Sequence, residues 1–185
     1  MISLVIDTAT NRTSVALFED NQLLFSSFHD GATAHAEALP KLVKEALHTR
    51  SDIDEVVVGM GPGPFTGLRV GITFAQTFAH ARQIPWREAC SLDAMDVDSQ
   101  SYIVTSDARR KEVYWAKYEN GKRVTGPHVS APQEVTALGD MKFGFGFTEP
   151  LYPSMAMLLA RSRTAPIEGP LYLRRPDAVP TSERR

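Results

Sequence analysis

The sequence has a single cysteine, Cys90, among its 185 residues. One cysteine excludes a disulfide framework and a cysteine zinc cluster, although it leaves open a lone thiol nucleophile. Long apolar runs are also missing, because Arg69, Gln76 and His80 interrupt the best candidate. A membrane-spanning helix needs about 20 consecutive apolar residues, so we predict none.

A large excess of charge is absent as well. The formal net charge of −2 provides no global field toward nucleic acid. From Arg161 onward, however, the chain is basic, with six arginines and three acidic residues. Such a tail can touch RNA or an acidic partner, but chain ends of this kind are more often solvated, which we expect here. The first residues carry no basic segment and no cleavage site, so we predict a strand there and a cytoplasmic protein.

A glycine- and proline-rich loop follows the β-branched run at 56–58 and precedes a helical pattern. Such loops often bind phosphate, because backbone N–H groups and a helix N-terminus attract anions. Here no lysine follows for a P-loop, and Thr66 stands where a dinucleotide fingerprint has its third glycine. Pro62 and Pro64 also lack N–H donors. We therefore do not expect this loop alone to capture a nucleotide.

The helix predicted over 66–82 has Thr66 in position to cap it. Small residues recur every four positions along one of its faces, and this small-residue stripe consists of Gly67, Gly71, Ala75 and Ala79. The rest of the helix is apolar nearly all round, so we expect it to be covered on two sides. One side is its own sheet. The other is covered by a neighbouring helix of the same domain or by a partner protein, and the sequence leaves both open.

Strand and helix patterns occur twice in the same order. Asp20-Asn21 and Asn120-Gly121 predict tight hairpin turns within them. The first half is predicted to have strands at 2–6, 13–19, 22–29 and 56–59, a helix around 39–47 and the helix at 66–82. The second half is predicted to have strands at 102–106, 112–119, 122–129, 142–147 and 171–174, a helix at 130–138 opened by a capping box, and a helix at 154–163.

This repeat predicts an α/β protein of the actin-like (ASKHA) fold, with two tandem ribonuclease-H-like halves and the second one shortened. We expect the first half at 1–85, a linker at 86–100, and the second half with its basic tail at 101–185. Asp7 and Asp107 end the first strand of each half, where actin-like ATPases contact phosphates and metal through Asp-x-Gly turns. These aspartates are the candidate cofactor-binding residues. Neither turn has the glycine that lets the backbone approach, so we expect no cofactor.

Four segments carry a family resemblance: Ile6-Asp7-Thr8-Ala9-Thr10, Gly61-Pro62-Gly63-Pro64-Phe65-Thr66-Gly67-Leu68-Arg69-Val70-Gly71, Asp107-Ala108-Arg109-Arg110-Lys111-Glu112-Val113-Tyr114 and Pro170-Leu171-Tyr172-Leu173-Arg174. They resemble the TsaB family, also called YeaZ, of bacterial proteins needed to make threonylcarbamoyladenosine beside the tRNA anticodon. The similarity runs from residue 1 to about 178. Two departures stand out, since Pro64 replaces the usual serine and the second half is short.

The resemblance implies an actin-like, non-catalytic protein that pairs with the paralogous transferase TsaD through helices of its first half. A TsaE-like ATPase would join the pair, tRNA would be reached through the complex, and the isolated chain would form a homodimer. We therefore expect no catalytic residue and no metal. The predicted partner interface comprises His35, Leu39, Leu42, Val43, Leu47, Gly67, Arg69, Gly71, Ile72, Ala75, Phe78 and Ala79, with the small-residue stripe facing outward.

The residues keep two enzyme classes as alternatives, an actin-like nucleotide-dependent enzyme of ATPase or kinase type and a metal-dependent peptidase homologue that has lost its metal site. TsaD holds its metal with a His-x-x-x-His helix, and here Leu39 stands where the second histidine after His35 would be. A ribonuclease-H nuclease needs several converging carboxylates. Asp7 and Glu37 could supply two, but Gly59 stands where another is expected.

Overall fold

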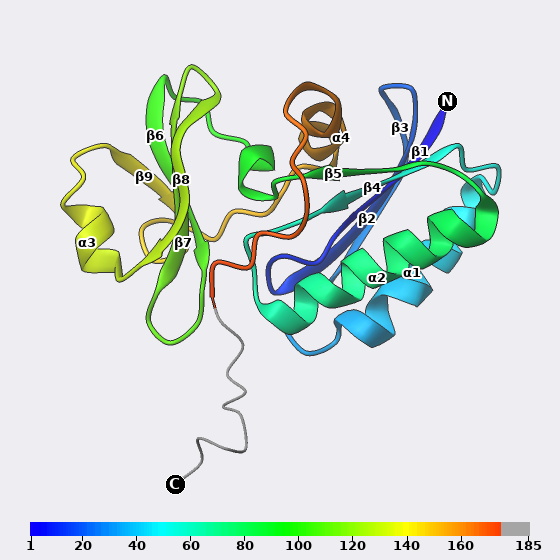
Figure 1. The fold of residues 1–185 in the computed structure, drawn as a ribbon, viewed down its shortest axis with the longest axis horizontal. Helices are drawn as coiled ribbons and strands as arrows, with labels where there is room; N and C mark the ends of the chain where they lie inside the picture. The colour runs from blue at the N-terminus through cyan, green and yellow to red at the C-terminus, as the bar shows by residue number, and fades with distance from the viewer. Residues whose placement is uncertain (175–185) are drawn as a thin grey trace, which may run out of the picture.

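The computed structural model describes residues 1–174, which form two β-sheets that lie next to each other (Figure 1). The first sheet has the strand order β3-β2-β1-β4-β5. Its central strand β1 pairs antiparallel with β2 and parallel with β4. The five strands are β1 (Ile2–Asp7), β2 (Arg12–Glu19), β3 (Gln22–Asp30), β4 (Glu55–Gly59) and β5 (Trp86–Ala89).

The second sheet repeats this pairing with one strand fewer, in the order β8-β7-β6-β9. β6 pairs antiparallel with β7 and parallel with β9, as β1 does with β2 and β4. The four strands are β6 (Ser101–Asp107), β7 (Val113–Glu119), β8 (Lys122–Ser130) and β9 (Met141–Gly144). The predicted order of strands and helices therefore occurs twice up to β9.

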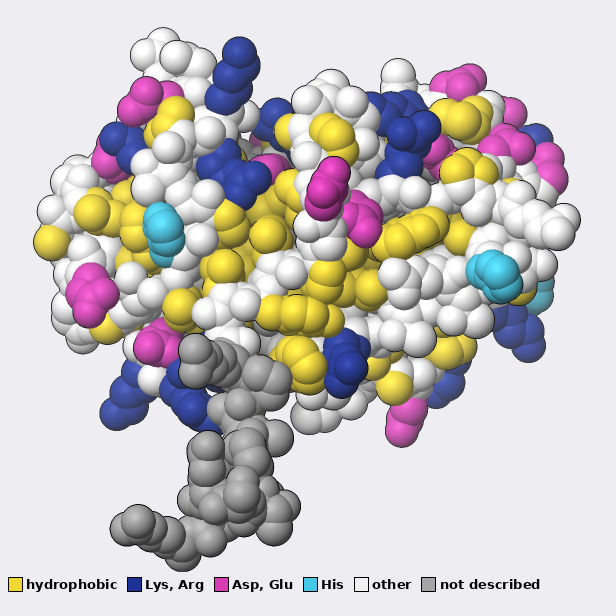
Figure 2. All heavy atoms as spheres, in the orientation of Figure 1, with side chains coloured by type: hydrophobic (Ala, Val, Ile, Leu, Met, Phe, Trp, Pro, Cys, Tyr) yellow, Lys and Arg dark blue, Asp and Glu magenta, His cyan; other side chains and the backbone are white. Residues whose placement is uncertain are grey.

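Hydrophobic side chains fill the junction between the two sheets. Figure 2 shows such side chains gathered in the middle of one face of the molecule, over the junction. Buried Leu92, in a 3-10 turn (η1, Leu92–Ala94), belongs to this cluster together with Tyr102 and Tyr114, and the late residue Leu171 packs against it. The halves are thus joined by a shared apolar core.

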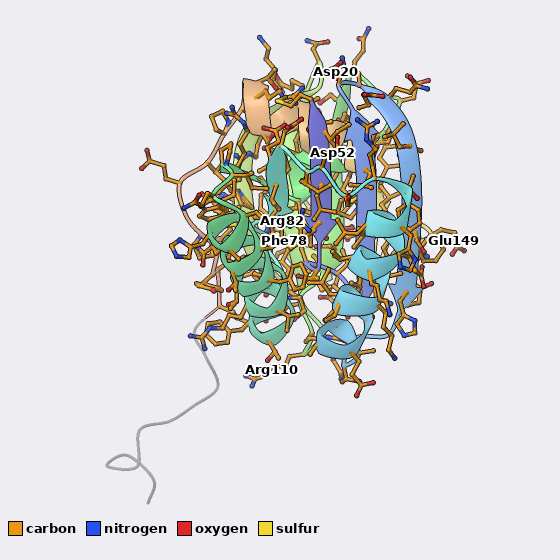
Figure 3. The ribbon with its side chains drawn as sticks, turned by 90° about the vertical axis from the view of Figure 1, so that its right-hand side faces the viewer. Asp20, Asp52, Phe78, Arg82, Arg110 and Glu149 are labelled. Carbon is orange, nitrogen blue, oxygen red and sulfur yellow. The ribbon has the colours of Figure 1, made fainter. Side chains whose placement is uncertain are left out.

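Two long helices, α1 (His35–Thr49) and α2 (Phe65–Arg82), lie next to each other on one face of the first sheet (Figure 3). Their inner sides share one hydrophobic core with every second residue of the central strands, including Leu4 and Ile6 of β1. Side chains alternate between the two faces of a strand, so the residues between them point to the opposite face.

That opposite face is covered by α4 (Met155–Thr164), whose Leu158 packs with Val5 and Val57. Because the sheet is covered on both faces, all three valines of the run at 56–58 are fully buried. α4 was predicted as part of the second half. α4 packs on the first sheet instead, so a helix that follows the second sheet in the sequence covers one face of the first sheet. The two halves therefore do not fold as separate units.

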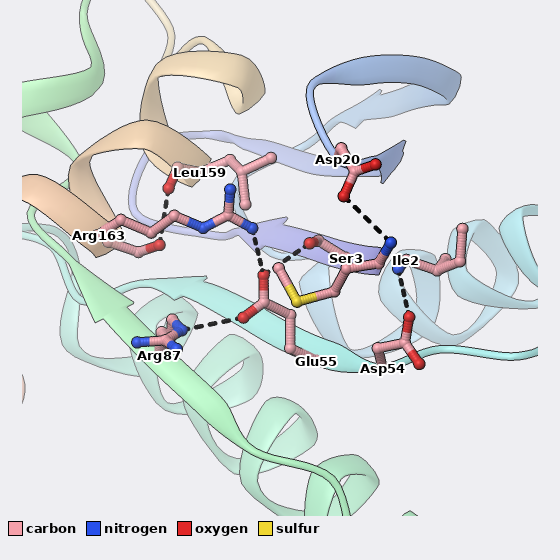
Figure 4. Close-up of polar contacts among 10 residues, drawn as sticks. Ile2, Ser3, Asp20, Asp54, Glu55, Arg87, Leu159 and Arg163 are labelled. Carbon is pink, nitrogen blue, oxygen red and sulfur yellow. Dashed lines mark hydrogen bonds and ion pairs between the residues drawn. The ribbon is translucent and has the colours of Figure 1, made fainter.

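A buried ion cluster fixes the end of α4 to this sheet (Figure 4). Glu55 of β4 accepts hydrogen bonds from Arg163 (2.7 Å), from Arg87 of β5 (2.9 Å) and from the Ser3 hydroxyl (2.7 Å). A carboxylate as buried as this one needs such partners, because desolvation disfavours an isolated charge. β1, β4, β5 and α4 are therefore held by one acidic residue.

Both predicted helix caps are wrong. α2 begins at Phe65 with Pro64 at its N-cap position, so Thr66 lies inside the first turn and not before it. Ser130 is the last residue of β8, and the helix that follows, α3 (Pro132–Thr136), has Ala131 at its N-cap without a side-chain hydrogen bond. The N-cap of α2 thus lies two residues before the predicted one, and the N-cap of α3 lies one residue after it.

Two predicted boundaries also differ from the structure. Residues 86–89, the start of the predicted linker, form β5 and pair in parallel with β4. The predicted final strand at 171–174 is not a strand, although the Leu171 N–H donates to the carbonyl of Met60. The basic tail beyond residue 174 lies outside the described residues. Within 1–174, no helix is long and apolar enough to cross a membrane.

Candidate functional site

An open, mainly apolar groove of about 600 Å³ runs between α1 and α2 on the outside of the molecule. We call it the helix-pair groove. Its lining residues are Ala36, Leu39 and Pro40 of α1 and Phe65, Thr66, Arg69, Val70, Thr73, Phe74 and Thr77 of α2. Most of these side chains are apolar or carry a single hydroxyl, so the groove is suited to bury against another apolar surface.

The small-residue stripe lies on the opposite side of α2, which corrects its predicted direction. All four residues of the stripe are buried. A Cβ atom added at Gly71 would lie 2.4 Å from Thr8 Oγ1, and one at Gly67 would lie 2.8 Å from the carbonyl oxygen of Thr8. Thr8 Oγ1 also donates to the Gly67 carbonyl (2.8 Å). The glycines let α2 approach the turn after β1 closely, within the same domain.

Several other predicted interface residues belong to the core as well. Leu42, Val43 and Ile72 are buried in the cluster beneath the two helices. His35 is buried at the start of α1, with its Nδ1 atom 2.8 Å from Thr13 Oγ1. Burial, with a smaller contribution from Arg109, lowers the pKa of His35. This histidine therefore acts as a neutral structural residue.

Of the predicted residues, Arg69 lines the groove with an exposed side chain, and Leu39 lies at the groove but is fully buried in the core. Leu47 and Phe78 are partly buried and pack against the core from outside. Sequence reasoning missed the rest of the lining, above all Phe65, Val70 and Thr73. Thr73 lies on the helix face opposite the small-residue stripe, and Phe65 and Val70 lie on either side of that face. These positions follow from the same periodicity once the stripe is turned inward.

Asp7, the first cofactor candidate, is engaged in hydrogen bonds within the protein. Its carboxylate accepts hydrogen bonds from the Ser91 hydroxyl (2.6 Å) and from the Ala9 N–H (2.9 Å). Complete burial raises the pKa of Asp7 to about 6, although both hydrogen bonds act to lower it. A Cβ atom at Gly59 would lie 1.9 Å from Asp7 Oδ2, so glycine is required at the end of β4.

Asp107, the second candidate, sits in a more open turn. Its Oδ1 atom accepts the Arg109 N–H (2.7 Å), and its Oδ2 atom lies 3.2 Å from the Arg109 guanidinium. Residues 109–111 have positive φ angles, and the side-chain bond supports that unusual backbone. The Asp107 carboxylate is thus engaged by the backbone and the side chain of Arg109, within its own turn.

The space between the two aspartate turns is small. A cavity of about 80 Å³ lies there, lined by Thr10, Asn11, Ser106, Asp107, Phe145, Pro150, Leu151 and Tyr152. Sites that enclose a ligand of drug or nucleotide size usually measure about 300–1,000 Å³. In this conformation the cavity is too small for a nucleotide.

The Gly-Pro-Gly-Pro loop is held by other parts of the chain. A Cβ atom at Gly63 would lie 2.3 Å from the Ala9 carbonyl oxygen, and the Tyr114 hydroxyl of the second half donates to the Gly63 carbonyl (3.2 Å). The Gly61 carbonyl accepts the Ser91 N–H (2.8 Å). The loop therefore connects the first half to the second and positions the start of α2.

Metal-binding and nucleophilic side chains offer no further candidate site among residues 1–174. Residues 1–174 contain no group of three or more histidine, cysteine, aspartate or glutamate side chains placed to hold a metal ion. Burial raises the pKa of Cys90 to about 12, so its thiol stays protonated at neutral pH and is a poor nucleophile. Ser91 donates its hydroxyl proton to Asp7, as described above.

Comparison with known proteins agrees with this architecture. The sequence model of the TsaD family, described as tRNA N6-adenosine threonylcarbamoyltransferase, matches residues 29–152. An uncharacterised protein of Mycobacterium bovis is 42% identical over 198 residues, covering 96% of this chain and 93% of the relative. TsaB of Escherichia coli is 35% identical over 131 residues, covering 64% of this chain and 56% of the relative.

Among solved structures, YeaZ from Pseudomonas aeruginosa superimposes with a TM-score of 0.77 at 26% identity, covering 93% of this chain and 99% of that one. The matched sheets and this likeness define an actin-like protein. The chain belongs to the TsaB (YeaZ) family, within the group that the TsaD sequence model describes. It spans little more than half, 56%, of the length of E. coli TsaB.

Proposed function

We propose that this chain acts in the formation of threonylcarbamoyladenosine in tRNA, as a non-catalytic subunit that docks a TsaD-type transferase in the helix-pair groove. The observation that carries the proposal is the groove itself, which joins two long helices of the first half and presents Phe65, Val70 and Phe74 together on the outside. An apolar groove between two helices is typical of a surface that binds a helix of a protein partner.

The two aspartate turns support the non-catalytic part of the proposal. Asp7 is buried and bound by Ser91, and Asp107 is bound by Arg109. The cavity between them has room for neither ATP nor a sugar substrate at about 80 Å³. These observations disfavour the alternative of an actin-like nucleotide-dependent enzyme. Titration of the isolated chain with ATP and magnesium tests this part, and tight binding would contradict it.

The remaining partners are inferred from the family alone. A TsaE-like ATPase would join the heterodimer, and tRNA would be contacted through the complex. In the absence of the transferase, a second copy of this chain would occupy the helix-pair groove and form a homodimer. An isologous dimer of this kind uses the same patch on both copies.

Docking is tested with the substitution Val70→Glu, which places a charge in the middle of the groove. We expect binding to the purified TsaD-type paralogue of the same organism to weaken by about a hundredfold or more, because docking would bury the new carboxylate against an apolar surface. Val124→Glu is the matched control, since Val124 is exposed on β8 in the second half. Titration calorimetry measures both affinities.

Circular dichroism shows whether each variant is folded. Should Val70→Glu unfold, Thr77→Arg at the other end of the groove provides a second variant. A folded groove variant that binds the paralogue as tightly as the unsubstituted chain would contradict the proposed docking site. Equal loss in the Val124→Glu control would do so as well.

A further inference from the structure

Arg69 is the single charged residue in the lining of the helix-pair groove. Its guanidinium lies over the ring of Phe65, 4.7 Å from the ring centre, and Phe65 in turn packs against Tyr172 at 4.9 Å. The side chain is exposed, and it has no ion-pair partner among residues 1–174. The groove therefore presents a positive charge, oriented by an aromatic ring, at one end of an apolar surface.

Other arginines of the first half are engaged within the chain. Arg12 pairs with Asp30 at 2.7 Å, and Arg50 pairs with Asp52 at 2.7 Å. Arg82, at the far end of α2, donates to a backbone carbonyl. α2 itself contains no acidic residue that could satisfy Arg69. The charge on Arg69 is thus left for something outside the described chain.

Docking would remove water from this guanidinium. A charge that loses its water is disfavoured unless a charged or strongly polar group replaces it. The planar guanidinium fits a carboxylate best, since two parallel N–H···O bonds can form at once. The neighbouring ring of Phe65 would shield such a pair from solvent.

We propose that the partner seated in the helix-pair groove is an apolar helical surface carrying one carboxylate side chain, which pairs with Arg69. The inference rests on the proposed function, because it takes the groove as the docking site, and it adds the chemistry that the partner must bring. Apolar contact along the groove supplies affinity, and the single ion pair fixes which surface is accepted and in which register.

A second copy of this chain does not supply that carboxylate from its groove. The groove lining contains no aspartate or glutamate. The exposed acidic residues of the helix pair, Glu37 and Glu45, lie on α1 outside the lining. In a homodimer formed through the groove, Arg69 would be covered without a partner. The residue therefore favours the heterodimer over self-association.

Replacement of Arg69 by methionine tests the pair, because methionine keeps an unbranched apolar side chain and removes the charge. We expect Arg69→Met to weaken binding of the purified TsaD-type paralogue by about 30-fold or more, as truncation of a buried ion pair does. Self-association of the same variant should be unchanged or tighter. Arg69→Lys should fall between, since lysine keeps the charge without the planar fork.

Arg50→Met is the matched control, because Arg50 is paired at the far end of α1, outside the groove lining. Calorimetry measures the heterodimer and sedimentation velocity measures the homodimer. The affinity of the unsubstituted chain for the paralogue should also fall with added salt, and that of Arg69→Met should fall less.

The outcomes separate this inference from the proposed function. Unchanged paralogue binding by Arg69→Met, together with lost binding by Val70→Glu, would keep the groove as the docking site and reject the carboxylate. Unchanged binding by both would reject the docking site itself. Weakened self-association in both Arg69→Met and Glu37→Gln would show that a second copy satisfies Arg69, and this would overturn the selectivity argued here.

Discussion

The two halves of the protein have the same strand order but differ in what covers their sheets. The first sheet carries α1 and α2 on one face and α4 on the other. The second sheet has the five-residue helix α3 on one face and the junction core on the other. A repeated sheet thus supports different roles, because the helices decide which half presents an outer surface for docking.

The matched aspartates show the same contrast on a smaller scale. Asp7 and Asp107 both end the central strand of their sheet, yet Asp7 is 1% exposed and the Asp107 side chain is 29% exposed. The difference arises because Ser91 and the Gly-Pro-Gly-Pro loop close over Asp7, whereas the turn at 109–111 leaves Asp107 at the rim of the cavity.

The largest effect is expected from Gly71→Leu in the first half. This substitution would prevent the close approach of α2 to the turn after β1. The new Cβ atom would lie 2.4 Å from Thr8 Oγ1, so α2 would have to move off the sheet. We expect a loss of more than about 3 kcal/mol in the free energy of unfolding, as overpacking of a tight core produces. Urea unfolding followed by circular dichroism measures it.

Val70→Leu is the control for Gly71→Leu, since Val70 is the preceding residue on α2 and lines the groove. Its effect on stability should stay within about 1 kcal/mol, because Val70 is only half-buried and lines the open groove. Equal stability of the two variants would contradict the tight packing of Gly71 against Thr8, and a larger loss in Val70→Leu would mean that Val70 lies on the inner face of α2.

Local turn chemistry was predictable from the sequence. Asp20 and Asn120 adopt positive φ angles in two-residue turns between paired strands, because asparagine, aspartate and glycine tolerate that conformation. The fully apolar run at 56–58 likewise indicated a strand covered on both faces. Such features depend on a few neighbouring residues, which a single sequence contains.

The predictions that were wrong concern contacts between residues that lie far apart in the sequence. The periodicity of Gly67 and Gly71 defined a face of α2 but not its direction, which is set by Thr8. The place of α4 was missed because its partner Glu55 lies 108 residues before Arg163. Because the stripe was assigned to the outer face of α2, most of the residues that line the helix-pair groove were not predicted.

An effect of intermediate size is expected from the buried carboxyl group of the first half. Burial raises the pKa of Asp7 to about 6, above the value near 3.9 of an unfolded chain. The folded state therefore binds a proton more tightly, and this contribution to stability is fully present below about pH 4 and lost as the pH rises through about 6. The total loss is about 3 kcal/mol.

Asp7→Asn removes this titration. The free energy of unfolding of the variant, relative to that of the unsubstituted chain, should therefore rise by about 2 kcal/mol from pH 4 to pH 7, since other groups cancel in the difference. Ser91→Ala sharpens the comparison, because it removes a hydrogen bond that lowers the pKa of Asp7, and the loss should then shift to higher pH. A difference between Asp7→Asn and the parent that does not change with pH would contradict the assignment.

The smallest effect is expected at the bond that crosses between the halves. The Tyr114 hydroxyl of β7 donates to the Gly63 carbonyl at 3.2 Å, and the tyrosine is 2% exposed. Tyr114→Phe leaves that carbonyl without its donor while the ring keeps its packing, so we expect a loss of about 1 kcal/mol in the free energy of unfolding.

Tyr102→Phe is the control, because Tyr102 lies in the same junction core and its hydroxyl makes no hydrogen bond within residues 1–174. The free energies of unfolding of the two variants in urea should differ by about that amount, since of these two tyrosines Tyr114 is the one bonded to the loop that starts α2. Equal stability of the two variants would mean that the Tyr114 hydrogen bond does not help to hold the halves together.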